Sequence, residues 1–245
     1  MAWKAMVLVT LVPFGAMAQA AAPAEAQAER PAEEWWAGHQ VVVGSRKIPL
    51  LGELETRSDT FVLARVVREG EAFVLEQRSC KLEIAKVAGV QVAFRDDMES
   101  PTTKIRFRPE GGRWVAEPWL TAWAEEDVDH DGNPGATVTV DAPICNGLLY
   151  VGGRSLTRAR AEEHGGTLRG QVLVDVAQKI YGSSSTCLSL MAKDSEDEVR
   201  GTFAYAPVPA GSTCQSLLAG AWPVRADDPR RAREAAPRRE RIKIR

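Results

Sequence analysis

Three aspartates, Asp127, Asp129 and Asp131, alternate along a short acidic segment that Gly132 follows. This spacing is the first half of the calcium-loop pattern D-x-[DN]-x-[DN]-G. In a tightly curved loop alternate side chains turn toward one centre, and calcium takes six to eight oxygens at about 2.3–2.6 Å. The glycine stands where such a loop turns sharply, and Asn133 would offer its backbone carbonyl. The sequence therefore predicts a calcium site at Asp127, Asp129, Asp131 and Asn133.

The same trio is unfavourable without a cation. Two carboxylates about 4 Å apart repel by about 4 kcal/mol at an effective dielectric constant of 20. A bound divalent ion relieves this repulsion. The alternative is a solvated acidic turn between strands, with its side chains splayed into water. His130 occupies an outward-pointing position of the loop, so we expect it to be exposed and not a ligand.

The pattern departs from an EF-hand after the glycine. The twelfth loop position, where an EF-hand has a bidentate glutamate, is Val138. Residues 136–140 form a β-type run rather than the start of a helix. A closing ligand would have to come from another part of the chain or from the nearby acids Glu125, Glu126 and Asp141.

The segment from Asp127 to Val138 reads D-V-D-H-D-G-N-P-G-A-T-V. Its loop resembles the aspartate loops of dockerins and of thrombospondin type 3 repeats. The whole segment is similar to a D-x-D-x-D-G-x-P-G-[AV]-T-V run in a set of uncharacterised exported bacterial proteins, in which a Tyr-Val strand follows, here Tyr150 and Val151. The resemblance implies an exported all-β protein and carries no activity or substrate.

The two ends of the chain differ from its middle. Residues 1–20 combine a basic start, an apolar run and small-x-small sites, which is typical of a secretory signal peptide and too short for a membrane span. Residues 21–34 are rich in Ala, Glu and Pro and predict a disordered leader. Residues 223–245 predict a flexible basic tail. One domain at residues 35–222 remains, exported to the periplasm or the exterior.

Charge and hydropathy limit the partners of that domain. The tail from Arg225 onward holds nine Lys or Arg residues against four acidic ones, while the whole chain has a net charge of −2. The remainder is therefore acidic, which argues against nucleic-acid binding by the folded body. No later apolar run approaches the roughly 20 residues of a transmembrane helix.

Four cysteines, an even number, predict two disulfides in an exported chain. Three connectivities are possible, and we favour Cys80–Cys145 with Cys187–Cys214. The absence of a C-x-x-C motif or a Cys/His cluster argues against zinc and redox catalysis.

Ten to twelve strand-like runs separated by glycine and polar turns predict an all-β fold. Hairpins are expected at residues 60–84, 103–117 and 186–205. No segment of ten or more residues before Asp227 carries a period of 3.6. The expected architecture is an antiparallel, lipocalin-like up-and-down barrel or a sandwich.

Trp114, Trp119 and Trp123 fall within ten residues, and either pack in the core or form a ligand platform. No G-x-S-x-G, H-E-x-x-H or P-loop motif occurs, so no catalytic residue is assigned. We expect a non-catalytic secreted or periplasmic β-barrel domain with a calcium-ordered loop, which binds a small apolar ligand or an envelope component. The alternative is a secreted calcium-dependent hydrolase that uses paired carboxylates on carbohydrate.

Overall fold

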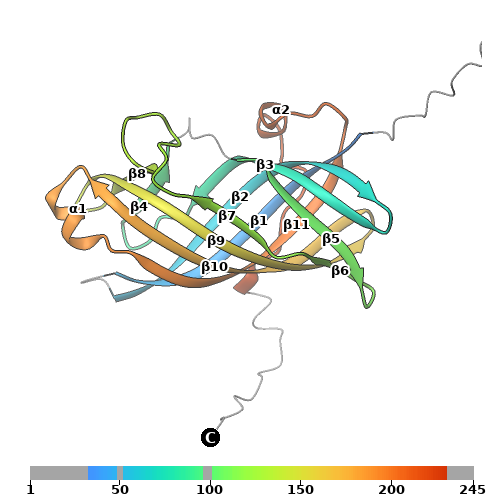
Figure 1. Cartoon of the computed structure of the whole chain (residues 1–245), viewed down its shortest axis with the longest axis horizontal. Helices are drawn as coiled ribbons and strands as arrows, with labels where there is room; N and C mark the ends of the chain where they lie inside the picture. Colours follow the sequence, from blue (N-terminus) through green and yellow to red (C-terminus); the bar gives the residue numbers. More distant parts are fainter. Residues whose placement is uncertain (1–32, 49–51, 96–100, 231–245) are drawn as a thin grey trace, which may run out of the picture. The chain divides into compact units, whose positions relative to one another are not determined.

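Eleven antiparallel strands form one sheet in the computed structural model, which describes residues 33–48, 52–95 and 101–230 (Figure 1). The expected signal peptide and nearly all of the expected leader lie outside these residues. The strands are β1 (Glu34–Ile48), β2 (Gly52–Glu69), β3 (Ala72–Ile84), β4 (Gln91–Phe94), β5 (Thr103–Glu110), β6 (Arg113–Ala116), β7 (Trp119–Trp123), β8 (Ala136–Asp141), β9 (Gly147–His164), β10 (Thr167–Ser183) and β11 (Ser195–Val208).

The strand pairings return to their starting point. From β1 they run through β2, β3, β5, β6, β9, β10 and β11, and β11 pairs with β1 again. The second edge of β9 is shared by three short strands, because β8, β7 and β6 pair with its residues 147–151, 153–157 and 160–161. The sheet is thus closed but uneven. Its total of eleven strands is odd and three of them share one edge of β9, so it is not a regular up-and-down barrel. The predicted all-β, antiparallel, single-domain fold is confirmed.

Aromatic and aliphatic side chains fill the inner face of the sheet. Phe73 is completely buried and stacks on Phe107, with 5.1 Å between ring centroids and 14° between ring planes. The Trp114 ring packs edge-on against the Phe73 ring with 4.8 Å between centroids. The Trp36 ring lies 5.9 Å from the Phe73 ring, also between centroids. Since side chains alternate between the two faces of a strand, each long strand contributes every second residue to this core.

Two of the three expected hairpins are confirmed. Glu69 pairs with Ala72 across the β2–β3 turn, and Glu110 pairs with Arg113 across the β5–β6 turn. The hairpin expected over residues 186–205 is wrong. Its first half is the short helix α1 (Thr186–Met191), which begins where the Ser185 side chain accepts a hydrogen bond from the Leu188 amide. A helix of 6 residues is too short to show a period in the sequence.

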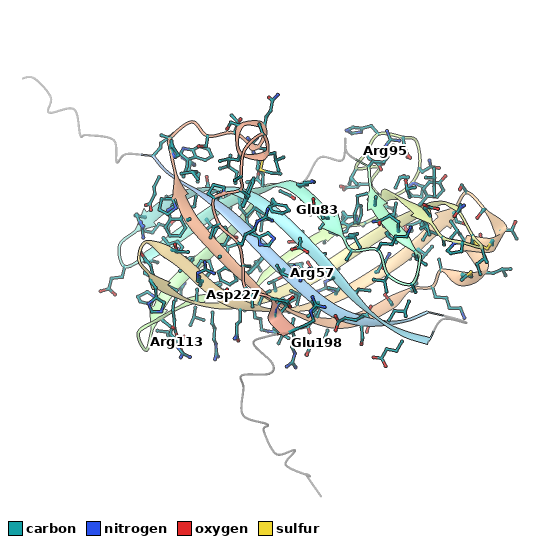
Figure 2. All side chains as sticks on the ribbon, turned by 180° about the vertical axis from the view of Figure 1, so that it is seen from behind. Arg57, Glu83, Arg95, Arg113, Glu198 and Asp227 are labelled. Atoms are coloured by element: carbon teal, nitrogen blue, oxygen red, sulfur yellow. A yellow bond between two sulfur atoms is a disulfide. The ribbon has the colours of Figure 1, made fainter. Side chains whose placement is uncertain are left out.

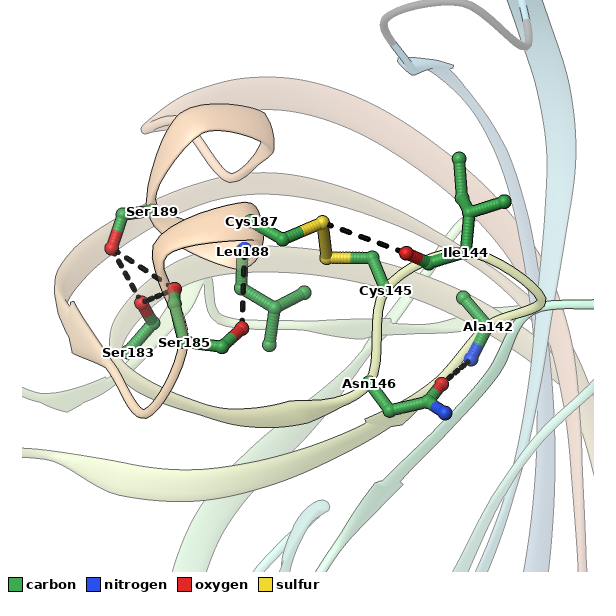
Figure 3. Close-up of a disulfide and its surroundings, with 9 residues drawn as sticks. All are labelled: Ala142, Ile144, Cys145, Asn146, Ser183, Ser185, Cys187, Leu188 and Ser189. Carbon is green, nitrogen blue, oxygen red and sulfur yellow. Dashed lines mark hydrogen bonds between the residues drawn. A yellow bond between two sulfur atoms is a disulfide. The ribbon is translucent and has the colours of Figure 1, made fainter.

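Both predicted disulfides form, but the favoured pairing is wrong. The bonds are Cys80–Cys214 and Cys145–Cys187. The second joins the turn before β9 to α1 (Figure 3), where Cys145 packs beside Leu188. The first joins β3 to the helix α2 (Cys214–Leu218). The pairing follows strand order in the closed sheet, which brings the C-terminal segment next to β3 across 134 residues of sequence.

Residues 219–230, called the strap below, cross the outer face of β1, β2 and β11. Trp222 and Val224 are buried there in a cluster with Ala37, Phe61 and Ala204. The sequence assigned residues 223–230 to a flexible tail, and the structure corrects this. The basic composition hid an alternating apolar pattern, because Trp222, Val224 and Ala226 all contribute to that cluster.

Replacing Phe73 with alanine should lower the free energy of unfolding by about 3–5 kcal/mol, because it empties a fully buried aromatic site. Urea denaturation measures this change. Leu82→Ala is the control, since Leu82 is 40% exposed and should change stability by less than about 1 kcal/mol. Equal losses in the two variants would contradict the assigned core.

Peptide mapping of the unreduced protein should recover Cys80 linked to Cys214 and Cys145 linked to Cys187. Closing the longer loop restricts the unfolded chain most, by about 5 kcal/mol in the chain-entropy model. The Cys80→Ser, Cys214→Ser double variant should therefore unfold at lower denaturant than the Cys145→Ser, Cys187→Ser variant. Recovery of a Cys80–Cys145 peptide would contradict the pairing.

Candidate metal centre

The acidic loop spans the gap between the end of β7 and the start of β8. Two backbone hydrogen bonds close its neck, from Val128 N to Gly135 O at 3.2 Å and from Gly135 N to Glu126 O at 3.1 Å. Gly135 has a φ of 79°, and a Cβ there would lie 2.4 Å from the carbonyl oxygen of Val151 in β9. Only glycine therefore allows the loop to sit this close to the sheet.

The three predicted carboxylates converge on one centre. Asp127, Asp129 and Asp131 each present one oxygen, and these three atoms lie within 4.8 Å of one another. Asp129 is only 4% exposed and the other two are partly buried. Of the two arrangements considered from the sequence, convergence and outward splaying, the structure has the first. The arrangement could hold a metal ion.

Hydrogen bonds from the loop itself hold two of the carboxylates in place. Asp127 accepts from Gly132 N at 2.8 Å and from Asp131 N at 3.1 Å, and the Gly132 bond is the main cause that lowers the pKa of Asp127. Asp131 accepts from Thr137 Oγ1 at 2.7 Å and from the backbone and side-chain amides of Asn133. The Thr137 bond is the main cause that lowers the pKa of Asp131. Both groups are therefore prepared to be anionic.

Asp129 is the exception in this network. Its Oδ2 accepts a hydrogen bond from Thr137 N at 2.8 Å. Its Oδ1 is buried and has no hydrogen-bond partner among the described residues. A buried carboxylate oxygen without a partner is unfavourable, and here two further carboxylates stand beside it. A cation at the shared centre would provide the missing partner.

The other residues considered from the sequence have different positions. Asn133 donates its backbone N–H and one side-chain N–H to Asp131 Oδ1, and its backbone carbonyl stays a predicted ligand. His130 is exposed, as expected, with a φ of 53°. The acids proposed to close the site, Glu125, Glu126 and Asp141, lie outside the three-carboxylate group. Glu125 instead lies 3.9 Å from Lys179 Nζ.

Two contributing residues were missed from the sequence. Thr137 holds both Asp129 and Asp131, although it reads simply as a strand residue. Arg95 Nη1 lies 3.8 Å from Asp131 Oδ2, and Figure 2 labels this arginine. The sequence did not indicate this role of Thr137, because a threonine at the start of a strand is common without any contact to a preceding loop. Arg95 precedes the loop by 32 residues in sequence, and no local pattern connects them.

The three tryptophans pack into the interior. Trp114 and Trp119 contact the main core cluster, and Trp123 contacts a separate cluster that includes Ala136, Val138 and Val151. Each ring is partly buried. Core packing thus accounts for all three, and a shared ligand platform stays an untested prediction.

Comparisons with protein-family models, curated proteins and solved structures find no match to this chain.

Asp129→Asn should stabilise the protein when divalent cations are removed. The substitution keeps an oxygen for the Thr137 amide and removes one of three crowded charges. We expect the melting temperature in EDTA to rise by about 2–4 °C, which corresponds to about 1 kcal/mol in a domain of this size. Calorimetry measures the shift, and a lower melting temperature than wild type in EDTA would contradict the crowding argument.

Proposed function

We propose that this protein is an exported, non-catalytic β-domain in which a calcium ion orders the loop between β7 and β8. The observation that carries the proposal is the convergence of three carboxylates around a buried Asp129 oxygen that has no hydrogen-bond partner in residues 33–48, 52–95 and 101–230. The repulsion among these carboxylates falls if one of them loses its charge or if a cation binds between them. Arg95 Nη1, 3.8 Å from Asp131 Oδ2, offsets part of this negative charge, while Asp129 Oδ1 still has no hydrogen-bond partner within the described part of the chain.

The donor set selects the class of ion. All three side chains offer carboxylate oxygen, and oxygen ligands suit calcium, magnesium and manganese rather than zinc or copper. Calcium accepts irregular shells of six to eight oxygens, whereas magnesium requires a near-ideal octahedron and retains water. A loop whose carboxylates are already fixed by Thr137 and by backbone amides favours the more permissive ion.

The expected role of the ion is structural. Thr137 belongs to β8, so a cation held by Asp129 and Asp131 would tie the loop to that strand. β8 in turn pairs with β4 and with the start of β9. Calcium would therefore stabilise the end of the sheet formed by β4, β8 and the start of β9, although the ion itself would contact only the loop.

Export is supported by the two disulfides, because such bonds persist in oxidising compartments. The composition of residues 1–20 supports the same conclusion. Within residues 33–48, 52–95 and 101–230, no helix has the length and apolarity required to cross a bilayer. We therefore propose the periplasm or the exterior as the site of action.

The packing of the sheet interior bears on the kind of partner. The inner face of the sheet is filled by its own aromatic and aliphatic side chains. For this reason we favour docking onto an envelope component over an apolar ligand held inside the sheet. No specific observation favours the carbohydrate hydrolase.

Calcium should raise the melting temperature of the metal-free protein. At free calcium 100-fold above its dissociation constant the stabilisation is about 2.7 kcal/mol, which corresponds to about 5–10 °C for a domain of this size. Differential scanning calorimetry across a millimolar calcium range measures the rise, and titration calorimetry gives the stoichiometry.

Asp129→Asn should remove this response, because it lowers the charge of the site and replaces an oxygen by an amide nitrogen. Asp141→Asn is the matched control, since it removes an exposed acid of β8 outside the cluster and should keep the full response. The proposal fails if wild type shows no heat of calcium binding, or if both variants respond equally.

A further inference from the structure

His39 is a buried titratable residue on the outer face of the sheet, far from the acidic loop in sequence. It is 3% exposed, with its ring 4.7 Å from the Phe61 ring. The strap covers it, and Trp222 packs edge-on against Phe61 at 5.2 Å. An ionisable group in such surroundings requires both ring nitrogens to have partners.

The two partners of His39 define its protonation state. The backbone N–H of Ala226, in the strap, donates to His39 Nδ1 at 2.9 Å. Nδ1 must therefore offer a lone pair and carry no proton. His39 Nε2 lies 3.1 Å from Asp59 Oδ1, and a carboxylate can only accept, so Nε2 carries the proton. The closed strap thus requires the neutral form of His39.

Protonation would turn the strap contact from attraction into repulsion. A proton on Nδ1 would face the N–H of Ala226, so two donors would meet with no acceptor between them. The cost of burial lowers the pKa of His39 below its ordinary value of about 6.5, and Arg225 and Arg57 act in the same direction against Asp59. The cation would become stable only if the strap moved away and water entered.

The neighbouring charges do not titrate in the same range. Burial is the largest single influence on Asp59 and acts to raise its pKa, but the hydrogen bonds and charge of Arg57 together with His39 outweigh it, so the pKa lies below its ordinary value. Hydrogen bonds from Arg230 hold the pKa of Asp228 well below its usual range. Both acids therefore stay anionic in mild acid, whereas His39 changes charge there. Asp227 and Glu55 also form ion pairs between strap and sheet, with Arg169 and Arg230, and the His39→Gln variant below separates any contribution of theirs from that of His39.

Further contacts hold the strap besides His39. Trp222 Nε1 donates to Gly38 O at 3.1 Å, Arg57 Nη1 donates to Asp228 Oδ2 at 3.1 Å, and Thr202 Oγ1 donates to Asp227 O. Exposed contacts add to these, because Arg169 Nη1 donates to Arg225 O at 3.1 Å and Arg230 Nη1 lies 3.4 Å from Glu55 Oε1. The Arg225 guanidinium also lies 4.8 Å from the centroid of the Phe61 ring. Figure 2 labels Arg57 on the sheet and Asp227 in the strap. The Cys80–Cys214 bond fixes the chain just before the strap. Opening can therefore leave the preceding helix in place.

We propose that His39 is a pH-sensitive latch, whose neutral form holds the strap over β1, β2 and β11 and whose protonation releases residues 222–230 while the sheet stays folded. Release uncovers Ala37, Phe61 and Ala204, which Trp222 and Val224 otherwise cover. The latch uses no residue of the metal centre, so it is independent of the proposed calcium function.

The direction of the pH effect follows from the lowered pKa. The open form binds a proton near pH 6.5 and the closed form only at lower pH, so closure is favoured above about pH 6.5 and weakens as the pH falls. Between the two pKa values the opening constant should increase by about tenfold for each pH unit. Amide hydrogen exchange of the full-length, disulfide-intact protein at about pH 7.5 and about pH 4.5, corrected for intrinsic rates, measures it at Ala226.

We expect protection at Ala226 to fall as the pH is lowered below about 6.5, with β1–β2 amides unchanged. His39→Gln keeps an acceptor for Ala226 and a donor for Asp59 without a titrating charge, so its strap protection should not depend on pH. His164→Gln, which removes a histidine whose side chain is 75% exposed, should behave as wild type.

Three results would overturn the latch. They are unchanged Ala226 protection in acid, an equal pH effect in His39→Gln, and loss of β1–β2 protection in parallel with the strap. If His39→Gln does not fold, ring ¹⁵N shifts of wild-type His39 decide: a neutral ring protonated on Nδ1 at pH 7.5 would also overturn the proposal.

Discussion

The repulsion among three carboxylates on one short bend is the constraint on which the functional end of this structure depends. Asp127, Asp129 and Asp131 are brought together because β7 and β8 must be joined beside β9, with Gly135 pressed against the Val151 carbonyl. Backbone amides and Thr137 donate five hydrogen bonds to these carboxylates, but Asp129 Oδ1 has no partner among the described residues. A divalent ion at the shared centre would relieve this conflict with no change of the fold.

The uneven sheet makes that bend possible. A regular meander would give each strand two full-length neighbours, whereas β9 shares one edge among β8, β7 and β6. Each short strand ends where the next begins, and the segment between β7 and β8 must leave the sheet and return to it. The acidic loop occupies this excursion. The irregularity of the fold and the location of the candidate site thus have one cause.

On the outer face of the sheet a buried polar side chain, His39, has a partner for each of its ring nitrogens, in contrast to Asp129 in the acidic loop. His39 is buried where the strap covers the sheet, and its two nitrogens connect Asp59 on β2 to the backbone of Ala226. An apolar residue there would have left the partly buried Ala226 amide without this acceptor. The histidine satisfies that amide only while neutral, so the same contact that closes the strap makes its closure depend on pH.

The sequence by itself determined the local features of this protein. Period-two alternation and glycine turns predicted the β2–β3 and β5–β6 hairpins, aspartate spacing predicted the converging trio, and four cysteines predicted two disulfides. Tertiary structure alone decided which cysteines pair, that α1 replaces a strand, that Trp222 and Val224 lie on the sheet, and that Thr137 and Arg95 reach the acidic loop. Each of these depends on the order of strands around the closed sheet. Local periodicity specifies which face of a strand is buried, but it does not specify which distant strand lies beside it.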